Sequence, residues 1–305
     1  MSRRATALGL AAAAVAVTGA TVVAHGGPST LAPAASARSA VPGTGPEVVA
    51  TGVRKPVRAT GHTSARTEHT RDAWTKVAVA TVWIRPAKAR AVDRAALAAR
   101  PSIGRWIDRQ TLAQREGLTN RVMTQAVRGE PVEVLHRRGA WSKVRLPQQR
   151  GSYFTHGIVG WVRTHHLATG PRPHSATAHP APRHPDGADV VRVARRYLGV
   201  RYLWGGMSRH GIDCSGLTYR VLRELGTTLA RDAADQSRAG HAVRRSALRP
   251  GDLVFFSPSG WTAIHHVGIY AGHGLVLHAP HTGARVRLTP LSAWHDYWGA
   301  RRILR

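Results

Sequence analysis

One cysteine stands alone among the 305 residues: Cys214, in the stretch GIDCSGLTYR, between Asp213 and Ser215. A lone thiol cannot form an intramolecular disulfide, so in an exported chain it is either an inert apolar residue or a reactive group. A Gly-rich loop leads into Cys214, and apolar residues at helical spacing follow it. We therefore expect the thiol at a helix N-terminus capped by Asp213. Free N–H groups and the helix dipole there lower a thiol pKa and favour the nucleophilic thiolate.

Two histidines are the candidate bases for this thiol. The stretch AIHHVGIYAGHGLVLHAP (263–280) predicts a hairpin with strands at 265–270 and 274–279. In that register His266 lies directly opposite His278, with a Cβ separation of about 5 Å. One imidazole would take the proton of Cys214 while the second fixes its tautomer. His265 has the opposite parity and should point to the other face.

Cysteine and histidine are also zinc ligands, so a metal site is an alternative use of the same side chains. A catalytic zinc usually has three protein ligands supported by carboxylates, and few acids surround His266 and His278. The histidines between the two domains, His174, His179 and His184, also lack acids and cysteines around them. We expect no metal and no cofactor.

The elements that position these groups predict an α+β domain at 188–305. A helix is expected from Asp189 to Gly199, a second from Cys214 to Gly226, and three strands between 252 and 279. Helices followed by antiparallel strands are typical of this fold class.

A smaller β domain is expected at 74–169. Short β-prone runs separated by turn residues are typical of a small β-barrel, and the stretch at 106–122 reads as a helical or loop insertion. A Pro-rich segment at 170–187 has no apolar face and predicts a linker between the domains.

The N-terminal residues have the pattern of a secretory signal peptide at 1–37, with cleavage after about residue 24 or 37. A membrane anchor is the alternative, but Thr18, Gly19 and Thr21 interrupt the apolar run. The segment at 38–73 lacks a hydrophobic period and predicts a flexible tether. We therefore predict a secreted or wall-associated protein that is not inserted in the membrane after cleavage.

A formal net charge of +28 favours contact with polyanions. No helix-turn-helix, zinc-ligand or aromatic-basic RNA motif accompanies the charge, so nucleic acid is not the expected partner. Biased arginine usage explains the charge equally well. For an exported chain, the anionic polymers of a bacterial envelope are the more natural partners.

Six motifs resemble, in order, the NlpC/P60 cysteine peptidases of bacterial cell walls over about residues 189–305. They are RYLWGG (201–206), GIDCSGLTYRVLRELG (211–226), LARDAADQ (229–236), LRPGDLVFF (248–256), HHVGIYAG (265–272) and VLHAP (276–280). The resemblance implies a papain-like fold with Cys214, His266 and His278 as the catalytic residues. It also implies peptidoglycan stem peptides as substrates, cut between γ-D-glutamate and a diamino acid, typically diaminopimelate.

The upstream stretches from VATVWIRP (79–86) to GWV (160–162) resemble the SH3-like domain of the γ-D-glutamyl-L-diamino acid endopeptidase branch. The resemblance implies that Tyr202 lines the oxyanion position and that Asp213 and Ser215 hold the free amine of an N-terminal L-Ala. It implies that Arg231 and Asp232 shape the cleft.

That branch supplies a Glu and a Tyr from the SH3-like domain to the amine pocket, where this sequence has Met123 and Ile158. Attack on intact wall stems therefore becomes more plausible than a strict need for a free amine. Two other functions stay open. One is an N-acetylmuramoyl-L-alanine amidase or an acyltransferase on the same fold, and the other is a non-catalytic wall-binding module.

Overall fold

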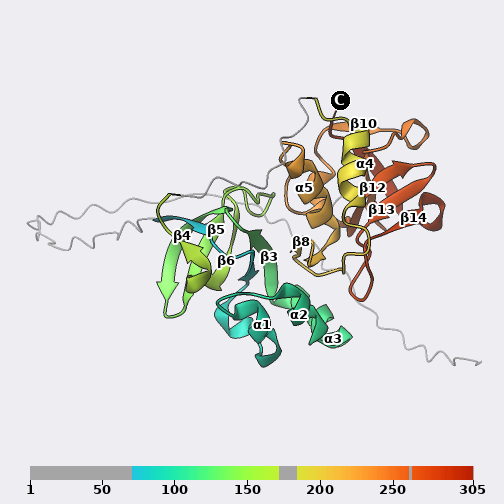
Figure 1. Cartoon of the computed structure of the whole chain (residues 1–305). Coiled ribbons are helices and arrows are strands. Elements are labelled where there is room, and N and C mark those ends of the chain that lie inside the picture. The colour runs from blue at the N-terminus through green and yellow to red at the C-terminus, as the bar shows by residue number, and fades with distance from the viewer. Residues whose placement is uncertain (1–70, 172–183, 261–262, 305) are drawn as a thin grey trace, which may run out of the picture. The chain divides into compact units, whose positions relative to one another are not determined.

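The computed structural model describes residues 71–171, 184–260 and 263–304 (Figure 1). The expected signal peptide, the tether up to residue 70 and the linker from 172 to 183 lie outside the described residues. Several element boundaries differ by a few residues from the prediction: for example, the first strand begins at Arg71, and the first helix of the second domain runs from Gly187 to Arg195. No helix in these three ranges has the length and apolar composition needed to cross a bilayer.

The N-terminal part is a seven-stranded antiparallel sheet in the order β3-β2-β6-β5-β4-β1-β7. Its strands are β1 (Arg71–Thr75), β2 (Val79–Trp83), β3 (Val122–Val127), β4 (Pro131–Arg138), β5 (Trp141–Leu146), β6 (Ile158–Arg163) and β7 (Leu167–Ala168). Successive side chains of a strand face opposite sides, so Ser142, Val144 and Leu146 of β5 all point inward. The predicted short strands are therefore present, and their inward residues form one core.

Short helices fill the connection between β2 and β3: α1 (Arg94–Leu97), α2 (Ile103–Asp108) and α3 (Leu112–Glu116). The predicted insertion is helical, but it begins earlier in the chain than residue 106. Trp106 of α2 packs against Trp83 of β2 with ring centroids 6.0 Å apart, and its indole N–H donates to Asp93 at 2.8 Å. Leu203, from the C-terminal part, joins the same apolar cluster.

The C-terminal part combines three helices with a six-stranded antiparallel sheet in the order β10-β15-β11-β12-β13-β14. The helices are α4 (Gly187–Arg195), α5 (Cys214–Glu224) and α6 (Ala233–Gln236). The strands are β10 (His241–Val243), β11 (Leu253–Phe256), β12 (His266–Gly272), β13 (Leu275–His278), β14 (Arg287–Pro290) and β15 (Tyr297–Arg302). A two-stranded ribbon, β8 (Met207–Ser208) with β9 (Gly211–Ile212), precedes α5. The α+β order expected from the sequence is present.

The helix α5 connects the cysteine to this sheet, because it packs on both α4 and β12 (Figure 1). Leu217, Val221 and Leu222 of α5 are fully buried, as are Val267 and Ile269 of β12. One apolar layer therefore fixes the start of α5 beside β12, the strand that begins with His266.

Candidate active site

Cys214 is the first residue of α5, as its sequence position predicts. Asp213 caps the helix, and its carboxylate accepts a hydrogen bond from the Gly216 backbone N–H at 2.6 Å. Backbone hydrogen bonds from Val267 and Ser215 reach the Cys214 thiol. Because Val267 follows His266 in β12, the thiol lies beside the strand that carries the first imidazole.

The Cys214 side chain is only 8% exposed, and this burial decides its protonation. Burial, followed by the negative charge of Asp213, raises the pKa of the Cys214 thiol to about 12. The hydrogen bonds from Val267 and Ser215 and the charge of Arg231 act in the opposite direction and do not compensate. The expected lowering of this pKa by the helix N-terminus is therefore wrong for the free site.

The two imidazoles meet as expected. His266 Nε2 lies 2.9 Å from His278 Nδ1, and the rings are edge to face with centroids 5.0 Å apart. Burial lowers the pKa of His266 to about 3, with a smaller contribution from His278. Burial, followed by the charge of Arg287, lowers the pKa of His278 to about 4. Both rings are therefore neutral at neutral pH, and the resting site pairs a thiol with a neutral imidazole.

The hairpin reaches this contact in a different register from the predicted one. Ile269 pairs with Leu277 and Tyr270 pairs with Val276. When this register is extended by one residue, Gly268 lies opposite His278. His266 is thus a diagonal neighbour of His278, two residues along the strand. The shift by two keeps both rings on one face, because side chains alternate with period two.

Gly268 makes this diagonal contact possible. A Cβ at position 268 would lie 3.1 Å from the His278 Cβ and 2.4 Å from a Val276 methyl carbon. On the other side of His266, the indole of Trp294 stacks at a centroid distance of 5.2 Å and an angle of 14°. His265 instead contacts Asp296, with Nε2 2.6 Å from the carboxylate, and stays out of the pair.

Tyr202 lies close to the thiol. Its pKa is raised by burial and, next, by the charges of Cys214 and Asp213, so the phenol stays neutral. Among the described residues, nothing forms a hydrogen bond with its hydroxyl. That O–H group is a free donor beside the nucleophile.

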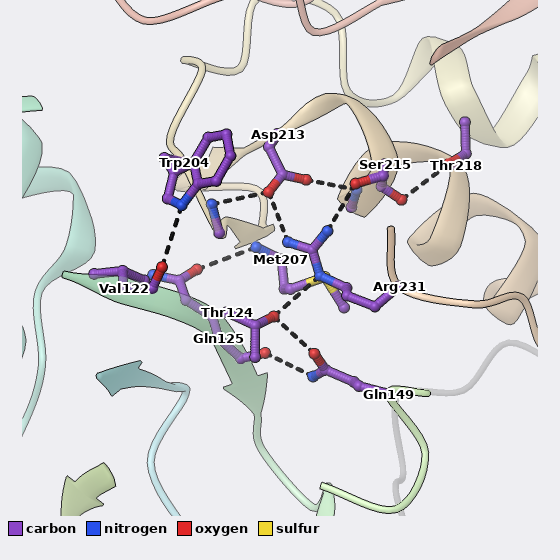
Figure 2. Close-up of polar contacts among 12 residues, drawn as sticks. Val122, Thr124, Gln125, Gln149, Trp204, Met207, Asp213, Ser215, Thr218 and Arg231 are labelled. Atoms are coloured by element: carbon purple, nitrogen blue, oxygen red, sulfur yellow. Dashed lines mark hydrogen bonds and ion pairs between the residues drawn. The ribbon is translucent and has the colours of Figure 1, made fainter. Parts of the chain in front are cut away.

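Arg231 is 3% exposed and binds both residues that flank the cysteine (Figure 2). Its Nη2 donates to Asp213 Oδ2 at 2.6 Å, Nη1 to Ser215 Oγ at 2.9 Å, and Nε to Thr124 Oγ1 at 3.0 Å. Asp213 Oδ2 also accepts from the Gly205 backbone N–H at 2.8 Å. In the free site Arg231 therefore engages both Asp213 and Ser215, and their role in holding a substrate amine stays a prediction.

Strand β3 carries this network into the N-terminal sheet (Figure 2). Gln149 accepts from Thr124 Oγ1 at 2.7 Å and donates to the Gln125 carbonyl at 2.8 Å. The Gln125 side chain accepts from the Met207 backbone N–H at 3.1 Å, and the Trp204 indole N–H donates to the Val122 carbonyl at 3.2 Å. Single threonines and glutamines in a β-strand carry no motif, so sequence reasoning missed them.

Three further positions bear on the predicted amine pocket: Met123 and Ile158, which replace amine-binding residues of the related branch, and Asp232, which was predicted to shape the cleft. Ile158 is buried in the N-terminal sheet, and Met123 packs partly against the same core, so neither offers a polar group. Asp232 is exposed and forms no hydrogen bond among the described residues. Partial desolvation raises its pKa, while neighbouring Arg231 lowers it. Asp232 is the unpaired carboxylate beside the network.

No group of three or more His, Cys, Asp and Glu side chains in the described ranges is arranged to hold a metal ion. The site is therefore described by its thiol, two imidazoles and phenol.

Comparison with known proteins gives the family. The model of the NlpC/P60 family matches residues 199–303. Over 272 residues the chain is 29% identical to the γ-D-glutamyl-L-lysine dipeptidyl-peptidase of Bacillus subtilis strain 168, spanning 70% of this chain and 92% of that one. It is 40% identical over 116 residues to the murein DD-endopeptidase MepH of Escherichia coli K12, which is 35% of this chain and 42% of that one.

A solved structure is similar over both parts of the chain. The crystal structure of an NlpC/P60 family protein from Bacillus cereus ATCC 10987 has a TM-score of 0.70 and 26% sequence identity, covering 77% of this chain and all of the other. Residues 199–303 therefore form an NlpC/P60 domain, the domain of a family of cysteine peptidases, in a chain that is homologous to γ-D-glutamyl-L-lysine dipeptidyl-peptidases.

Proposed function

We propose that this chain is a secreted peptidoglycan hydrolase that cleaves the amide between γ-D-glutamate and the diamino acid of stem peptides. The similarity to the γ-D-glutamyl-L-lysine dipeptidyl-peptidase supports this, because it extends well beyond residues 199–303 and includes the N-terminal sheet. We propose that this sheet is an SH3-like module that borders the substrate. Residues 1–37 would direct export, and the excess of arginine would favour anionic wall polymers as partners.

The proposed reaction follows from the protonation states of the site. The Cys214 sulfur attacks the amide carbonyl while His266 Nδ1 takes the thiol proton, because His266 Nε2 is engaged with His278. His266 then gives that proton to the leaving amine, and water hydrolyses the resulting thioester. Since thiol and imidazole start neutral, proton transfer accompanies attack instead of preceding it.

The oxyanion formed in this attack needs donors. We propose the backbone N–H of Cys214, at the start of α5, and the hydroxyl of Tyr202. Loss of one such donor costs on the order of 10²–10³ in kcat. Tyr202→Phe, which keeps the ring, should show a loss of this size with the binding of substrate little changed.

The single observation that carries the proposal is the 2.9 Å contact between His266 Nε2 and His278 Nδ1. It lies beside Cys214, because Val267, the residue after His266, forms a backbone hydrogen bond with the Cys214 thiol. The test is release of diaminopimelate from L-Ala-γ-D-Glu-diaminopimelate. Cys214→Ala should lower the rate by about 10⁴-fold or more. His265→Ala is the matched control, since His265 lies outside the pair, and should retain activity. Unchanged release by Cys214→Ala would show that Cys214 is not the nucleophile, whereas no release by the wild-type protein would leave only a wall-binding function.

We also propose that a free N-terminal amine is not required. Arg231 occupies Asp213 and Ser215, and Met123 and Ile158 are apolar, so among the described residues predicted for this pocket Asp232 remains to bind an ammonium group. The same tripeptide with an acetylated amine should be cleaved within about threefold of the free peptide, a ratio worth less than 1 kcal/mol. A loss of 100-fold or more on acetylation would contradict this and assign the amine to Asp232, which Asp232→Asn would then test.

The second candidate is cleavage of another bond on the same fold. The named activity of the similar MepH protein is that of a murein DD-endopeptidase, so membership of the family does not fix the bond. Mass spectrometry of products from a defined muropeptide separates the cases. An amidase would free the L-Ala amine from the sugar lactyl group, whereas the proposed endopeptidase leaves L-Ala-γ-D-Glu on the sugar.

A further inference from the structure

A threonine on the outer strand of the sheet contacts the second imidazole from behind. His278 Nε2 lies 2.9 Å from Thr289 Oγ1 of β14, the strand paired with β13. His278 is 1% exposed, so this hydroxyl takes the place that water would have at an open ring. We propose that Thr289 is a positioning residue that fixes the tautomer of His278 and, through it, that of His266. The inference rests on the proposed roles of Cys214 and the two histidines.

A count of hydrogens supports the inference. A neutral imidazole has one N–H donor and one bare nitrogen acceptor. For His266 Nδ1 to take the Cys214 proton it must be bare, so the hydrogen of His266 is on Nε2 and is donated to His278 Nδ1. His278 then carries its own hydrogen on Nε2 and donates it to Thr289 Oγ1. Each imidazole N–H in this chain has an acceptor.

The opposite order would disable the site. If the Thr289 hydroxyl donated to His278 Nε2, the hydrogen of His278 would be on Nδ1 and would point at His266 Nε2. His266 would then carry its hydrogen on Nδ1 and could not accept the thiol proton there. Thr289 therefore has to act as an acceptor for His266 to be a base.

Turnover favours the same order. When His266 has taken the thiol proton, both of its nitrogens carry hydrogen, so Nε2 must donate to a bare His278 Nδ1. His278 can present that bare nitrogen only if its hydrogen stays on Nε2, against Thr289. The charge of Arg287 also disfavours protonation of His278, which helps to keep the proton on His266.

The test compares Thr289→Val, which keeps the shape and removes the oxygen, with Thr289→Ser, which keeps the oxygen. We expect kcat for tripeptide hydrolysis to fall by about 10- to 100-fold in Thr289→Val with KM unchanged, by analogy with the loss on removing the hydrogen-bond partner of a metal-ligating histidine. Thr289→Ser should restore kcat to within about threefold. Thr228→Val, the same change on an exposed loop, should leave kcat unchanged.

A second measurement determines the tautomers of His266 and His278 independently of enzymatic activity. Nitrogen-15 NMR of the histidine side chains in the wild-type protein should show His278 with its hydrogen on Nε2, and Thr289→Val should shift that population. Wild-type His278 with its hydrogen on Nδ1 would overturn the inference, even if the valine variant fails to fold. Wild-type kcat in a folded Thr289→Val would overturn it as well. Retained activity in Cys214→Ala would instead refute the proposed function and leave the tautomer result standing.

Discussion

The buried ion pair between Arg231 and Asp213 makes a strong prediction about stability. Their side chains are 3% and 9% exposed, and their closest atoms lie 2.6 Å apart. Arg231→Met keeps most of the apolar stem but removes the donors to Asp213, Ser215 and Thr124. The Asp213 carboxylate would keep only backbone N–H donors, from Gly205 and Gly216. An uncompensated buried charge of this kind costs about 3–5 kcal/mol.

Urea unfolding followed by tryptophan fluorescence measures this loss. Asp213→Asn leaves the guanidinium without its counter-charge and should cost a similar amount. The double variant with Arg231→Met and Asp213→Asn buries neither charge. Its loss in free energy of unfolding should therefore be smaller than the sum of the two single losses by about 2 kcal/mol or more. Arg145→Met is the matched control, because Arg145 and Glu133 form a pair that is about 30% exposed, and it should cost less than about 1 kcal/mol.

Two results would refute the reasoning. Arg231→Met could cost no more than the Arg145→Met control, which would mean that water reaches Asp213 in the folded chain. Alternatively, the loss in free energy of unfolding of the double variant could equal the sum of the losses of Arg231→Met and Asp213→Asn, which would mean that the two charges do not stabilise each other.

Three further predictions follow from burial and backbone geometry. Alkylation of Cys214 by iodoacetamide should accelerate by about tenfold per pH unit from pH 7 to 9, because its raised pKa keeps the thiolate fraction small; a plateau near pH 7 would instead reveal a preformed thiolate. Gly205→Ala should destabilise the chain by about 1–3 kcal/mol, because φ is +73° and the new Cβ would lie 2.9 Å from a Val122 methyl carbon. Gly199→Ala, with φ +79° and nothing within 4 Å of its Cβ, should cost less, and equal losses would show that the contact with β3 is not restrictive. Burial lowers the pKa of His166 to about 4, so as the pH falls this histidine is protonated in the unfolded chain before it is protonated in the folded chain. The free energy of unfolding should therefore decrease from about pH 6.5 down to pH 4. His166→Gln should reduce this decrease in urea titrations, and an unchanged decrease would show that His166 is not its source.

Helices α4 and α5 were predictable because their signals are local. The apolar face after Cys214 and the acid before it predict where α5 begins, and the structure begins it there. Strand β15 of the C-terminal sheet was missed, and so were the edge strands β10 and β14, which are three or four residues long and mostly exposed or half-buried. Such edge strands owe their conformation to a neighbouring strand and not to their own residues.

The contact between His266 and His278 was predictable from strand parity, and the position of Cys214 at the start of α5 was predictable from the residues around it. The protonation states of these groups were not predictable. The pKa of Cys214 could not be predicted, because burial raises it by more than the N–H groups at the helix N-terminus lower it, and burial depends on the tertiary structure. The engagement of Asp213 by Arg231 depends on a contact between residues 18 positions apart, which no local pattern encodes.

The tight turn between β12 and β13 limits how many residues can be inserted into or deleted from this hairpin. Deletion or insertion of one residue that slides β13 by one position would send the His278 ring through to the far side of the sheet, while a slide by two would leave it on the near side. Lineages that vary the length of this tip should therefore do so in even steps, or carry a compensating bulge like the one already present between Tyr270 and Gly272.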